Sequence, residues 1–586
     1  MRPTLSEMGE YDGTALMERK TRKNIVYRIK NETACTYEFD DTPPFSVNRE
    51  ALGQAIEIAL LLKTNIVGEL HITRKQYLDG SIPTGFQRTA IVGIEGEIPL
   101  SNKTVRMIQI SLEEDACREV SDVGHWRVYR TDRLGMPLIE SVTYPDMLTP
   151  DEAAEAGNYL RFLTRSSGKV RTGIGAARQD VNVSITGGTR VEIKGVAHIK
   201  WIPELTHNEA FRQKALLKIK EVLSRVVSDP GSWRLSVKDL DYEQLGAECI
   251  PMRQACSEGA RLVAVNLPGF RSVLSFFTQP GKMFADELSD RLKVIACLEK
   301  PNMLHSEQLK PCLTPQDMEM VVSLTGASEN DAQVIVWGDS EDVDTAIETI
   351  EERCLMAFDG VPNETRKSLP DGTTIFERVL PGPDRMYPDT DSAPIPIPED
   401  LIEDARRRMP VDVSERLRQL REWEVPADCT PYLLRRNLIP LVERIAGATQ
   451  YSPGFVCRLF GHTLKHLEPK TDGWTEVRIE RLFGLFTFAD AGNLNSELVK
   501  VLLTGFMTHP HEEFDVILRN TGYAPRSRED ILESIPGLAG EFVYNGNGDH
   551  ARARERWMMG QLRIRALGNM PLSELFQHVR KEVAHG

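Results

Sequence analysis

The chain lacks the cysteine and hydrophobic patterns that mark secreted, zinc-binding and membrane proteins. Its nine cysteines form no Cys-x-x-Cys pair and no zinc-ligand spacing. No stretch approaches the ~18 consecutive apolar residues that a membrane helix needs, and the chain opens without the apolar segment of a secretory signal. We therefore expect reduced thiols, a cytoplasmic location and no membrane association.

Motifs of several common enzyme classes are also missing. The sequence has no Gly-x-x-x-x-Gly-Lys-[Ser/Thr] phosphate loop, no Gly-x-Ser-x-Gly nucleophile elbow and no internal repeat. We therefore expect any catalysis to depend on positioning and on electrostatic stabilisation of phosphoryl transfer, rather than on covalent catalysis.

What is present is a long, acidic chain of otherwise ordinary soluble composition. Its 586 residues are 41% hydrophobic and 27% charged, with a formal net charge of −15. This length predicts about three to four domains. The negative charge argues against indiscriminate binding of polyanions, although it leaves room for a local basic face.

Hydrophobic patterning predicts helices and strands in the first half of the chain. Residues 48–63 carry apolar side chains at helical spacing behind Asn48, which can cap a helix. Short alternating runs from 66 to about 200 predict strands, interrupted by one helix with Thr149 as its cap and Pro150 at its first position.

The pattern changes twice further along the chain. A second helix is predicted at 206–228, and strands alternate with helices over 232–360. After a proline-rich segment, nearly everything from 399 onward is helix-forming. Together these patterns predict an α+β multidomain protein with a helical tail.

Three acidic residues, Glu113, Glu114 and Asp115, end a strand-like stretch in the sheet-rich part. Because neighbouring side chains on a strand point to opposite faces, only one of the two glutamates can enter a given pocket. The spacing does not choose between them. A charged strand end at the surface is the alternative interpretation.

Glu140 ends a second aliphatic strand, where a carboxylate needs a cation or hydrogen-bond donors. Because Mg²⁺ prefers oxygen ligands, Glu114 with Glu140 fits a metal site, and a buried ion pair of Glu140 with Arg130 or Arg133 is the alternative. Lys75 lies between a predicted strand and a turn, where it can either contact a polyphosphate or remain a solvated charge.

Several segments together resemble the GatB/GatE family, the transamidating subunits of tRNA-dependent amidotransferases. The resemblance rests on Gly-Phe-Gln-Arg-Thr (85–89), Leu-Glu-Glu-Asp-Ala (112–116), Asp-Arg-Leu-Gly-Met-Pro-Leu-Ile-Glu (132–140), Arg-Gln-Asp-Val-Asn-Val-Ser-Ile (178–185) and Val-Glu-Ile-Lys-Gly-Val (191–196). A helical motif at 556–568 extends it to the tail, so it covers essentially the whole chain.

The resemblance implies ATP-dependent transamidation of glutamate carried by tRNA(Gln). ATP phosphorylates the γ-carboxylate, and ammonia from an asparaginase-like glutaminase subunit, with which the chain would form a heterotetramer, displaces the phosphate. Carried over to this sequence, Glu114 and Glu140 would bind Mg²⁺, Glu113 would support them, and Lys75 would contact phosphate or the incoming amine. The remaining residues implied to line the ATP cradle are Arg133, Asp180, Asn182, Lys194, Arg385 and Tyr387.

The resemblance also implies a domain plan. An inserted module is similar to one that the archaeal branch of the family shares with bacterial-type aspartyl-tRNA synthetases. The expected parts are a sheet-rich cradle (1–240), the inserted α/β module (241–360), a return segment of the cradle (361–398), a helical linker domain (399–440) and a helical tail that binds tRNA (441–586). A synthetase that charges tRNA is disfavoured, because nothing outside the inserted module offers an adenylate-forming site.

Arginines gather in the helical part of this otherwise acidic chain and are candidates for contact with tRNA phosphates. They are Arg435, Arg436, Arg552, Arg554, Arg556, Arg563 and Arg565. Helix-borne arginines are also commonly solvated or paired with neighbouring acids, which is the alternative interpretation.

The start of the chain departs from the family pattern. Relatives begin with a strand that bears an acidic residue and a histidine of the metal site, ahead of the segment with which this chain opens. We expect a start codon assigned too late, because a missing strand would leave an unpaired sheet edge. The alternative is a truncated paralogue that acts as an inactive tRNA-binding or assembly subunit.

Overall fold

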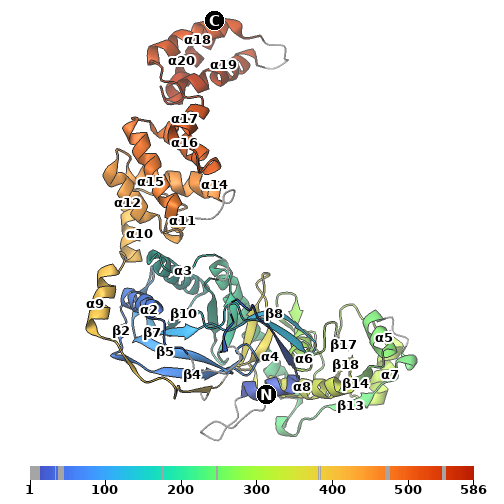
Figure 1. Ribbon diagram of the computed structural model, residues 1–586. Coiled ribbons are helices and arrows are strands. Elements are labelled where there is room, and N and C mark those ends of the chain that lie inside the picture. Colours follow the sequence, from blue (N-terminus) through green and yellow to red (C-terminus); the bar gives the residue numbers. More distant parts are fainter. Residues whose placement is uncertain are drawn as a thin grey trace. The chain divides into compact units, whose positions relative to one another are not determined.

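The structure, a computed structural model, divides into two compact units (Figure 1). The first contains Met1–Arg161 and Lys169–Met409, and the second contains Phe162–Gly168 and Pro410–Gly586. The described residues are 13–32, 34–36, 45–173, 176–245, 249–380, 382, 385–468, 476–543 and 549–585. The opening residues, on which the expectation of a missing leading segment rests, lie outside them.

A seven-stranded antiparallel sheet dominates the first part of unit one. Its order is β10-β7-β5-β4-β21, with β2 pairing β5 and β6 pairing β7. The strands are β2 (Asn65–Ile66), β4 (Ile72–Gln76), β5 (Phe86–Ile94), β6 (Glu97–Pro99), β7 (Thr104–Glu114), β10 (Pro137–Thr143) and β21 (Met386–Pro388). Helix α2 (Arg49–Leu61) packs on β5 and β7. The predicted cap is confirmed, since Asn48 Oδ1 accepts from Ala51 N at 2.9 Å.

Three smaller sheets complete the strands around it. The sheet β1-β9-β8 contains one parallel pair, as does the sheet β11-β12-β19-β20. Their strands, with the pair β3 and β22, are β1 (Asn24–Arg28), β3 (Glu69–Leu70), β8 (Arg118–Val123), β9 (Trp126–Arg130), β11 (Gln179–Val183), β12 (Val191–Val196), β19 (Glu364–Ser368), β20 (Thr374–Val379) and β22 (Ile395–Pro396). Helices α1 (Gly13–Thr21), α3 (Pro150–Ser166) and α9 (Glu399–Arg408) precede, interrupt and follow these strands in the sequence. Thr149 Oγ1 accepts from Glu152 N at 3.2 Å, which confirms the predicted start of α3.

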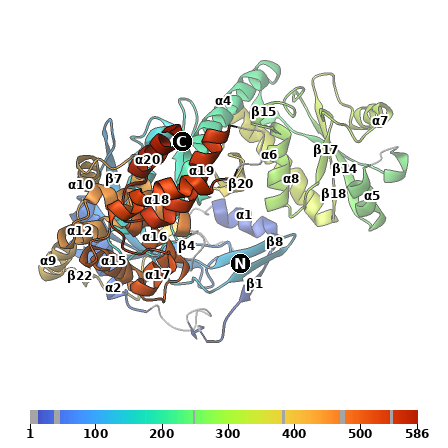
Figure 2. The same ribbon diagram turned by 90° about the horizontal axis from the view of Figure 1, so that it is seen from above.

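The region of alternating strands and helices forms an antiparallel sheet, β13-β14-β18-β17, with helices beside it. Its elements are β13 (Ser236–Asp239), α5 (Ile250–Ser257), β14 (Arg261–Leu267), β15 (Phe277–Gln279), β16 (Lys282–Met283), α6 (Phe284–Ile295), β17 (Met303–His305), α7 (Pro315–Thr325), β18 (Ala332–Gly338) and α8 (Ser340–Asp359). Helix α4 (Ile202–Val226) contributes Leu216 and Leu223 to the same core as Phe270 and Phe284. Figure 2 shows α4, α6 and α8 beside one another, and α8 contacts both α4 and α6. The region therefore packs against α4.

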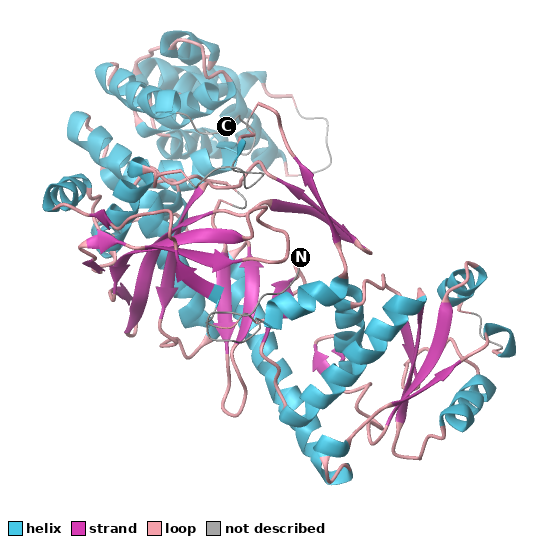
Figure 3. Cartoon of the chain, turned by 60° about the horizontal axis from the view of Figure 1, so that its bottom comes forward, coloured by secondary structure: helices cyan, strands magenta, loops and turns pink. Residues whose placement is uncertain are grey.

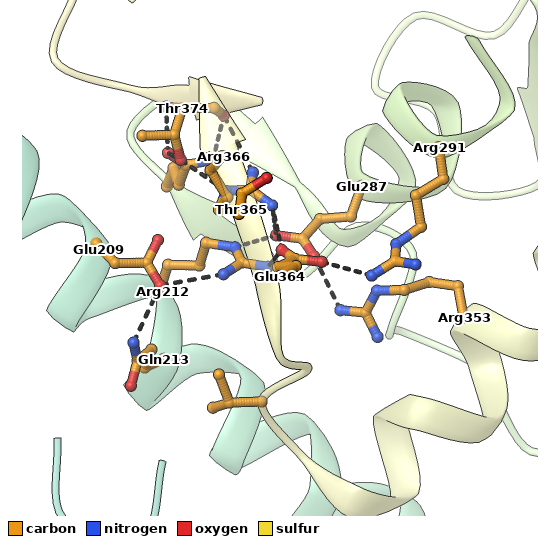
Figure 4. Close-up of polar contacts among 12 residues, drawn as sticks. Glu209, Arg212, Gln213, Glu287, Arg291, Arg353, Glu364, Thr365, Arg366 and Thr374 are labelled. Atoms are coloured by element: carbon orange, nitrogen blue, oxygen red, sulfur yellow. Dashed lines mark hydrogen bonds and ion pairs between the residues drawn. The ribbon is translucent and has the colours of Figure 1, made fainter. Parts of the chain in front are cut away.

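A buried ion network joins α4, α6, α8 and β19 (Figure 4). Arg212 donates to Glu287 Oε2 at 3.0 Å and also pairs with Glu364. Arg353 donates to Glu287 Oε2 at 2.8 Å, and Arg366 donates to Glu364 Oε1 at 2.6 Å. The members, each with a side chain at most 4% exposed, are Glu209, Arg212, Glu287, Arg291, Arg353, Glu364 and Arg366. These ion pairs tie helices α6 and α8 to the sheet β11-β12-β19-β20 through Glu364 and Arg366 on β19.

The described residues of unit two contain helices and no strand (Figure 3). The helices are α10 (Val413–Glu422), α11 (Thr430–Arg435), α12 (Ile439–Ala448), α13 (Pro453–Arg458), the π-helical segment η6 (Leu459–Leu464), α14 (Lys465–Leu467), α15 (Glu476–Ala491), α16 (Ser496–Thr508), α17 (Phe514–Asn520), α18 (Arg528–Glu541), α19 (His550–Ala566) and α20 (Leu572–His585). The predicted helical C-terminal region is confirmed.

The cores of unit two do not divide at residue 440. Leu438 and Leu441 belong to one apolar cluster that extends from Leu420 to Ile517, and a separate cluster joins α18, α19 and α20. The expected boundary between a linker domain and a tail at 440/441 therefore cuts through a single core. None of the described helices is long and apolar enough to cross a lipid bilayer.

Candidate active site

Polar side chains from four adjacent strands of the seven-stranded sheet share one face. Lys75 on β4 is paired in register with Gln87 on β5, and Thr89 on β5 is paired with Glu113 on β7. Glu140 on β10 lies opposite the residue two positions before Glu113, so it points to the same side. The antiparallel register therefore gathers these five side chains on one surface of the sheet.

Glu113 is buried among donors from two neighbouring strands. Lys75 Nζ lies 3.2 Å from Glu113 Oε1, and Thr89 Oγ1 donates to the same oxygen at 2.9 Å. Gln87 Nε2 donates to Glu113 Oε2 at 3.4 Å. The side chain of Glu113 is 7% exposed and that of Lys75 is 14% exposed. Neither residue is the solvated strand-end charge that was the alternative interpretation.

Glu140 lies close enough to Glu113 for their carboxyl groups to interact directly. Burial and the neighbouring charge of Glu113 raise the pKa of Glu140 to about 7, and Asp180 adds to the effect while Lys75 opposes it. Burial disfavours the charge on Lys75, but Tyr77 and the two glutamates outweigh burial and raise the pKa of Lys75 above its ordinary value. At neutral pH the site therefore holds an ammonium beside two carboxyl groups.

Glu114 lies on the opposite face of the sheet, so the expected pairing of Glu114 with Glu140 on one metal ion is wrong. Glu114 accepts from Arg88 Nε at 3.1 Å, and this pair lies on the side that α2 covers. A Cβ atom on Gly93, which shares that side beyond a bulge in β5, would lie 3.5 Å from Ala59 of α2. Strand alternation leaves Glu113 as the partner of Glu140.

The alternative ion pair of Glu140 with an arginine is not formed either. Arg133 Nε donates to the buried carboxylate of Asp115 at 2.6 Å. Arg130 Nη1 lies 3.9 Å from Asp132 Oδ2. Both arginines thus pair with other carboxylates, and the charges that act on Glu140 include those of Glu113, Lys75 and Asp180.

Three of the expected cradle residues lie on the sheet β11-β12-β19-β20. Asp180 Oδ1 accepts from Gly195 N at 2.9 Å, and Lys194 Nζ lies 4.0 Å from Asp180 Oδ2. Asn182 follows two residues later on β11 and is exposed. The charge of Asp180 contributes to the raised pKa of Glu140, so Asp180 lies near enough to Glu140 to act on it.

The last two expected cradle residues are separated by the sheet. The guanidinium of Arg385 lies 5.4 Å from the centre of the Tyr77 ring, and its charge acts on Lys75. Tyr387 is paired in register with Arg74, whose side chain points away from the Lys75 face. Arg385 is therefore placed at the site, whereas Tyr387 is not on its face.

Gln87 and Thr89 are the residues that sequence reasoning missed. Both belong to the Gly-Phe-Gln-Arg-Thr segment and lie two positions apart on β5. A spacing of two on a strand places both side chains on one face, so alternation within this segment was a usable signal.

The predicted tRNA-contacting arginines fall into two groups within unit two. Arg436 pairs with Glu468, as the alternative interpretation expected, while Arg435 is exposed. Arg165 donates to the carbonyl oxygen of Arg435 at 3.0 Å. Burial and the charges of Arg436 and Arg435 lower the pKa of Arg165, so this group has an excess of positive charge.

The second group lies on α19. Arg554 donates to the carbonyl oxygen of Ala539 at 2.8 Å and serves the packing of α18 on α19. Helical spacing places Arg552, Arg556 and Arg563 in one stripe, and all three are exposed. Arg565 is also exposed but lies on another side of the helix. Within the described residues no carboxylate pairs with the stripe.

Comparison with known proteins identifies the family around this site. The family model for the GatB/GatE catalytic domain matches residues 20–403, which include the whole Lys75 face. The chain belongs to the GatB/GatE family. It is 35% identical over 551 residues to the E subunit of glutamyl-tRNA(Gln) amidotransferase from Methanocaldococcus jannaschii, covering 93% of this chain and 86% of the relative.

Other archaeal relatives agree with this assignment. A protein of the same name from Sulfolobus acidocaldarius is 39% identical over 562 residues, covering 94% of this chain and 87% of the relative. The one from Methanococcus maripaludis is 32% identical over 596 residues, covering 100% of this chain and 93% of the relative. The GatB/GatE similarity thus extends through the helical unit.

Proposed function

We propose that the face of Lys75, Glu113 and Glu140 is the transamidation site of a glutamyl-tRNA(Gln) amidotransferase. The observation that supports this most is the placement of two carboxyl groups and one ammonium on the side of the sheet opposite α2, inside the family's catalytic domain. The relatives' names supply the reaction class.

The reaction would proceed in two displacements. An oxygen of the glutamyl γ-carboxylate bonds to the γ-phosphorus of ATP while the bond to ADP breaks. The nitrogen of ammonia then bonds to the γ-carbon, inorganic phosphate leaves, and the nitrogen loses a proton. Lys75, kept as an ammonium by its raised pKa, would hold phosphate oxygens rather than act as a base. Positioning and charge stabilisation would supply most of the rate.

Glu113 and Glu140 fit a bound Mg²⁺. The carboxyl groups of Glu113 and Glu140 are close enough for one to raise the pKa of the other, so they have too little positive charge nearby. A hard divalent cation would neutralise this pair. Mg²⁺ would supply charge neutralisation to the phosphate oxygens. Arg133, Arg385 and Lys194 would extend the positive surface for ATP.

The relatives' names imply a multisubunit amidotransferase that acts on tRNA, and the family resemblance of the sequence implies its parts. We assign the sheets of unit one to a cradle domain, and the β13-β14-β18-β17 region to the inserted module similar to one in aspartyl-tRNA synthetases. An asparaginase-like glutaminase subunit would supply ammonia within a heterotetramer. Unit two, with Arg435 and the stripe of Arg552, Arg556 and Arg563, would contact tRNA(Gln).

The test compares two neighbouring glutamates on opposite faces of one strand. With ATP, Mg²⁺, misacylated tRNA and an ammonium salt in place of the glutaminase, Glu113→Gln and Glu140→Gln should each lower the rate of Gln-tRNA formation by about 100-fold or more. Glu114→Gln is the matched control and should retain the rate within a few-fold, because Glu114 serves Arg88. Equal losses for all three variants would contradict the assignment.

The inactive-subunit alternative predicts a different result. Tight binding of tRNA(Gln) by the unmodified chain, without any Gln-tRNA formed from ammonium at saturating ATP and Mg²⁺, would favour a binding or assembly role. Using ammonium keeps this outcome separate from failure of the glutaminase partner.

A further inference from the structure

A second cluster of metal-binding side chain types lies in unit two, apart from the proposed active site. Cys429 Sγ lies 3.3 Å from His462 Nε2, and Asp428 Oδ2 lies 3.1 Å from the same nitrogen. The three ligand atoms all lie within 4.8 Å of one another. The cluster joins the loop before α11 to η6, and Cys429 and His462 are 33 positions apart in the chain.

Both contacts converge on one ring nitrogen of His462, and this distinguishes the cluster from a nucleophile relay. In a relay, the cysteine and the carboxylate contact different nitrogens of the imidazole, so that one nitrogen accepts a proton while the other donates. A single Nε2 carries either one proton or one lone pair. Sulfur, nitrogen and oxygen atoms gathered within 4.8 Å of one another are instead the arrangement of a ligand set for a cation.

The two separations from His462 Nε2 suit a tetrahedral zinc-type ion. Zn–S near 2.3 Å, Zn–N near 2.0 Å and Zn–O near 2.1 Å imply ligand-to-ligand separations of about 3.4–3.6 Å at tetrahedral angles. The observed separations of 3.3 Å and 3.1 Å are slightly shorter. Outward shifts of a few tenths of an ångström, within the freedom of exposed side chains, would accommodate the ion.

The local backbone holds the cysteine against the histidine. Residues of η6 are π-helical, an irregular turn that often occurs at functional sites. A Cβ atom on Gly461 would lie 2.4 Å from Cys429 Sγ, so only glycine permits this approach. Cys429 is fully buried, whereas the side chains of His462 and Asp428 are 52% and 66% exposed. The buried thiol thus forms the floor of a cluster that opens to solvent.

We propose that Asp428, Cys429 and His462 form a binding site for a zinc-type divalent transition metal. A thiolate and a carboxylate balance the charge of the ion, and the exposed side leaves a fourth position for water. The ion would clamp the start of α11 to η6 and so stabilise the helical core of unit two. This site is independent of the proposed transamidation chemistry, in which we give it no role.

Cobalt(II) provides a direct test on the full chain, because a cobalt–thiolate bond produces a charge-transfer absorption band that oxygen ligands do not. The metal-stripped, reduced chain titrated with Co²⁺ should develop this band with one equivalent, and Zn²⁺ should abolish it by displacement. The Glu113 and Glu140 site lacks a thiol, so Co²⁺ bound there is silent in this band.

The variants separate a designed site from adventitious binding. His462→Gln and Asp428→Asn, both at exposed positions, should weaken Co²⁺ binding at least about tenfold, which is the range expected for loss of one metal ligand or its support. Cys429→Ser should abolish the band. His466→Gln, an exposed histidine on α14, and Cys457→Ser, a buried cysteine of the same core, should leave it intact.

Three results would overturn the proposal. One is absence of the band in the unmodified chain. Another is a band that persists in Cys429→Ser, and a third is a band lost in Cys457→Ser but not in Cys429→Ser. If Cys429→Ser fails to fold, the two exposed variants still decide the question.

Discussion

Replacing Glu287 with glutamine should destabilise unit one more than any change to a surface ion pair. Glu287 accepts from both Arg212 and Arg353, and all three side chains are at most 3% exposed. The substitution keeps the shape of the side chain but removes its charge. It leaves four buried arginines of the network facing Glu209 and Glu364. Burial raises the pKa of Glu209 above its ordinary value, and the charge of Arg212 opposes this effect.

The size of the effect follows from two close charge contacts. At an effective dielectric constant of ~20, each contact near 4 Å contributes about 4 kcal/mol. Part of this is offset because the amide, unlike the carboxylate, loses little solvation on burial. Breaking one partner of a buried ion pair typically costs about 3–5 kcal/mol, and we expect Glu287→Gln to fall in this range.

Peptide-resolved hydrogen exchange in stepwise urea is the appropriate assay, because a chain of two units does not unfold in one step. Exchange in peptides from α6, α8 and β19 should report the loss. Asp344→Asn is the control: Asp344 pairs with Arg261 in a contact whose side chains are 65% and 31% exposed, and its loss should cost less than about 1 kcal/mol. If Glu287→Gln also costs less than about 1 kcal/mol, the network does not stabilise the fold as argued.

The remaining predictions concern the proposed active site and the helical unit. The pKa of Glu140 rises from 4.5 to about 7 on folding, so the folded chain keeps a proton that the unfolded chain releases. The stability of the metal-free chain, measured by urea titration, should therefore fall as pH rises from about 4.5 to about 7. The affinity for Mg²⁺, measured by calorimetry, should rise over the same pH range. If neither quantity changes with pH, the pKa shift of Glu140 is contradicted. Lys75→Met removes a charge that lowers this pKa, so the midpoint of Mg²⁺ affinity should move to higher pH. Changing Arg552, Arg556 and Arg563 together to glutamine should reduce the slope of log affinity for tRNA against log salt by about 0.7–0.9 per lost phosphate contact, and an unchanged slope would exclude the stripe.

Local chemistry made several elements predictable from the sequence. Asn48 and Thr149 cap their helices because the hydrogen bonds they make reach only three residues along the chain. Helix α4 begins at Ile202, four residues before its predicted start, with Pro203 in the first turn. Apolar spacing located the helix itself, because one face of it is buried.

The choice between Glu113 and Glu114 needed information that is not local. Alternation placed the two carboxylates on opposite faces, but which face carries the site depends on where α2 packs. The same reasoning separates Lys75 from Tyr387, whose neighbour in register is Arg74. Sequence reasoning thus found strands whose polar side chains meet, and it chose the wrong one of the two glutamates on β7 as the neighbour of Glu140.

The buried network was out of reach of any sequence pattern. Arg212 meets Glu287 across 75 positions and Glu364 across 152. In the sequence these residues resemble ordinary surface charges on amphipathic helices, which are the commoner case. The cluster of Asp428, Cys429 and His462 was hidden for the same reason, since its spacing matches no familiar zinc pattern.

Two buried charge clusters among the described residues of unit one differ in a way that bears on function. The Arg212 network has four guanidinium groups around three carboxylates, so each of its carboxylates has a positive partner. The Glu113 and Glu140 pair has one ammonium, that of Lys75, for two carboxyl groups, and burial together with the charge of Glu113 raises the pKa of Glu140. The Arg212 network thus has positive charge in excess, whereas a cation bound at Glu113 and Glu140 would supply the positive charge that this pair is short of. This contrast favours a metal-binding role for Glu113 and Glu140 over a structural one.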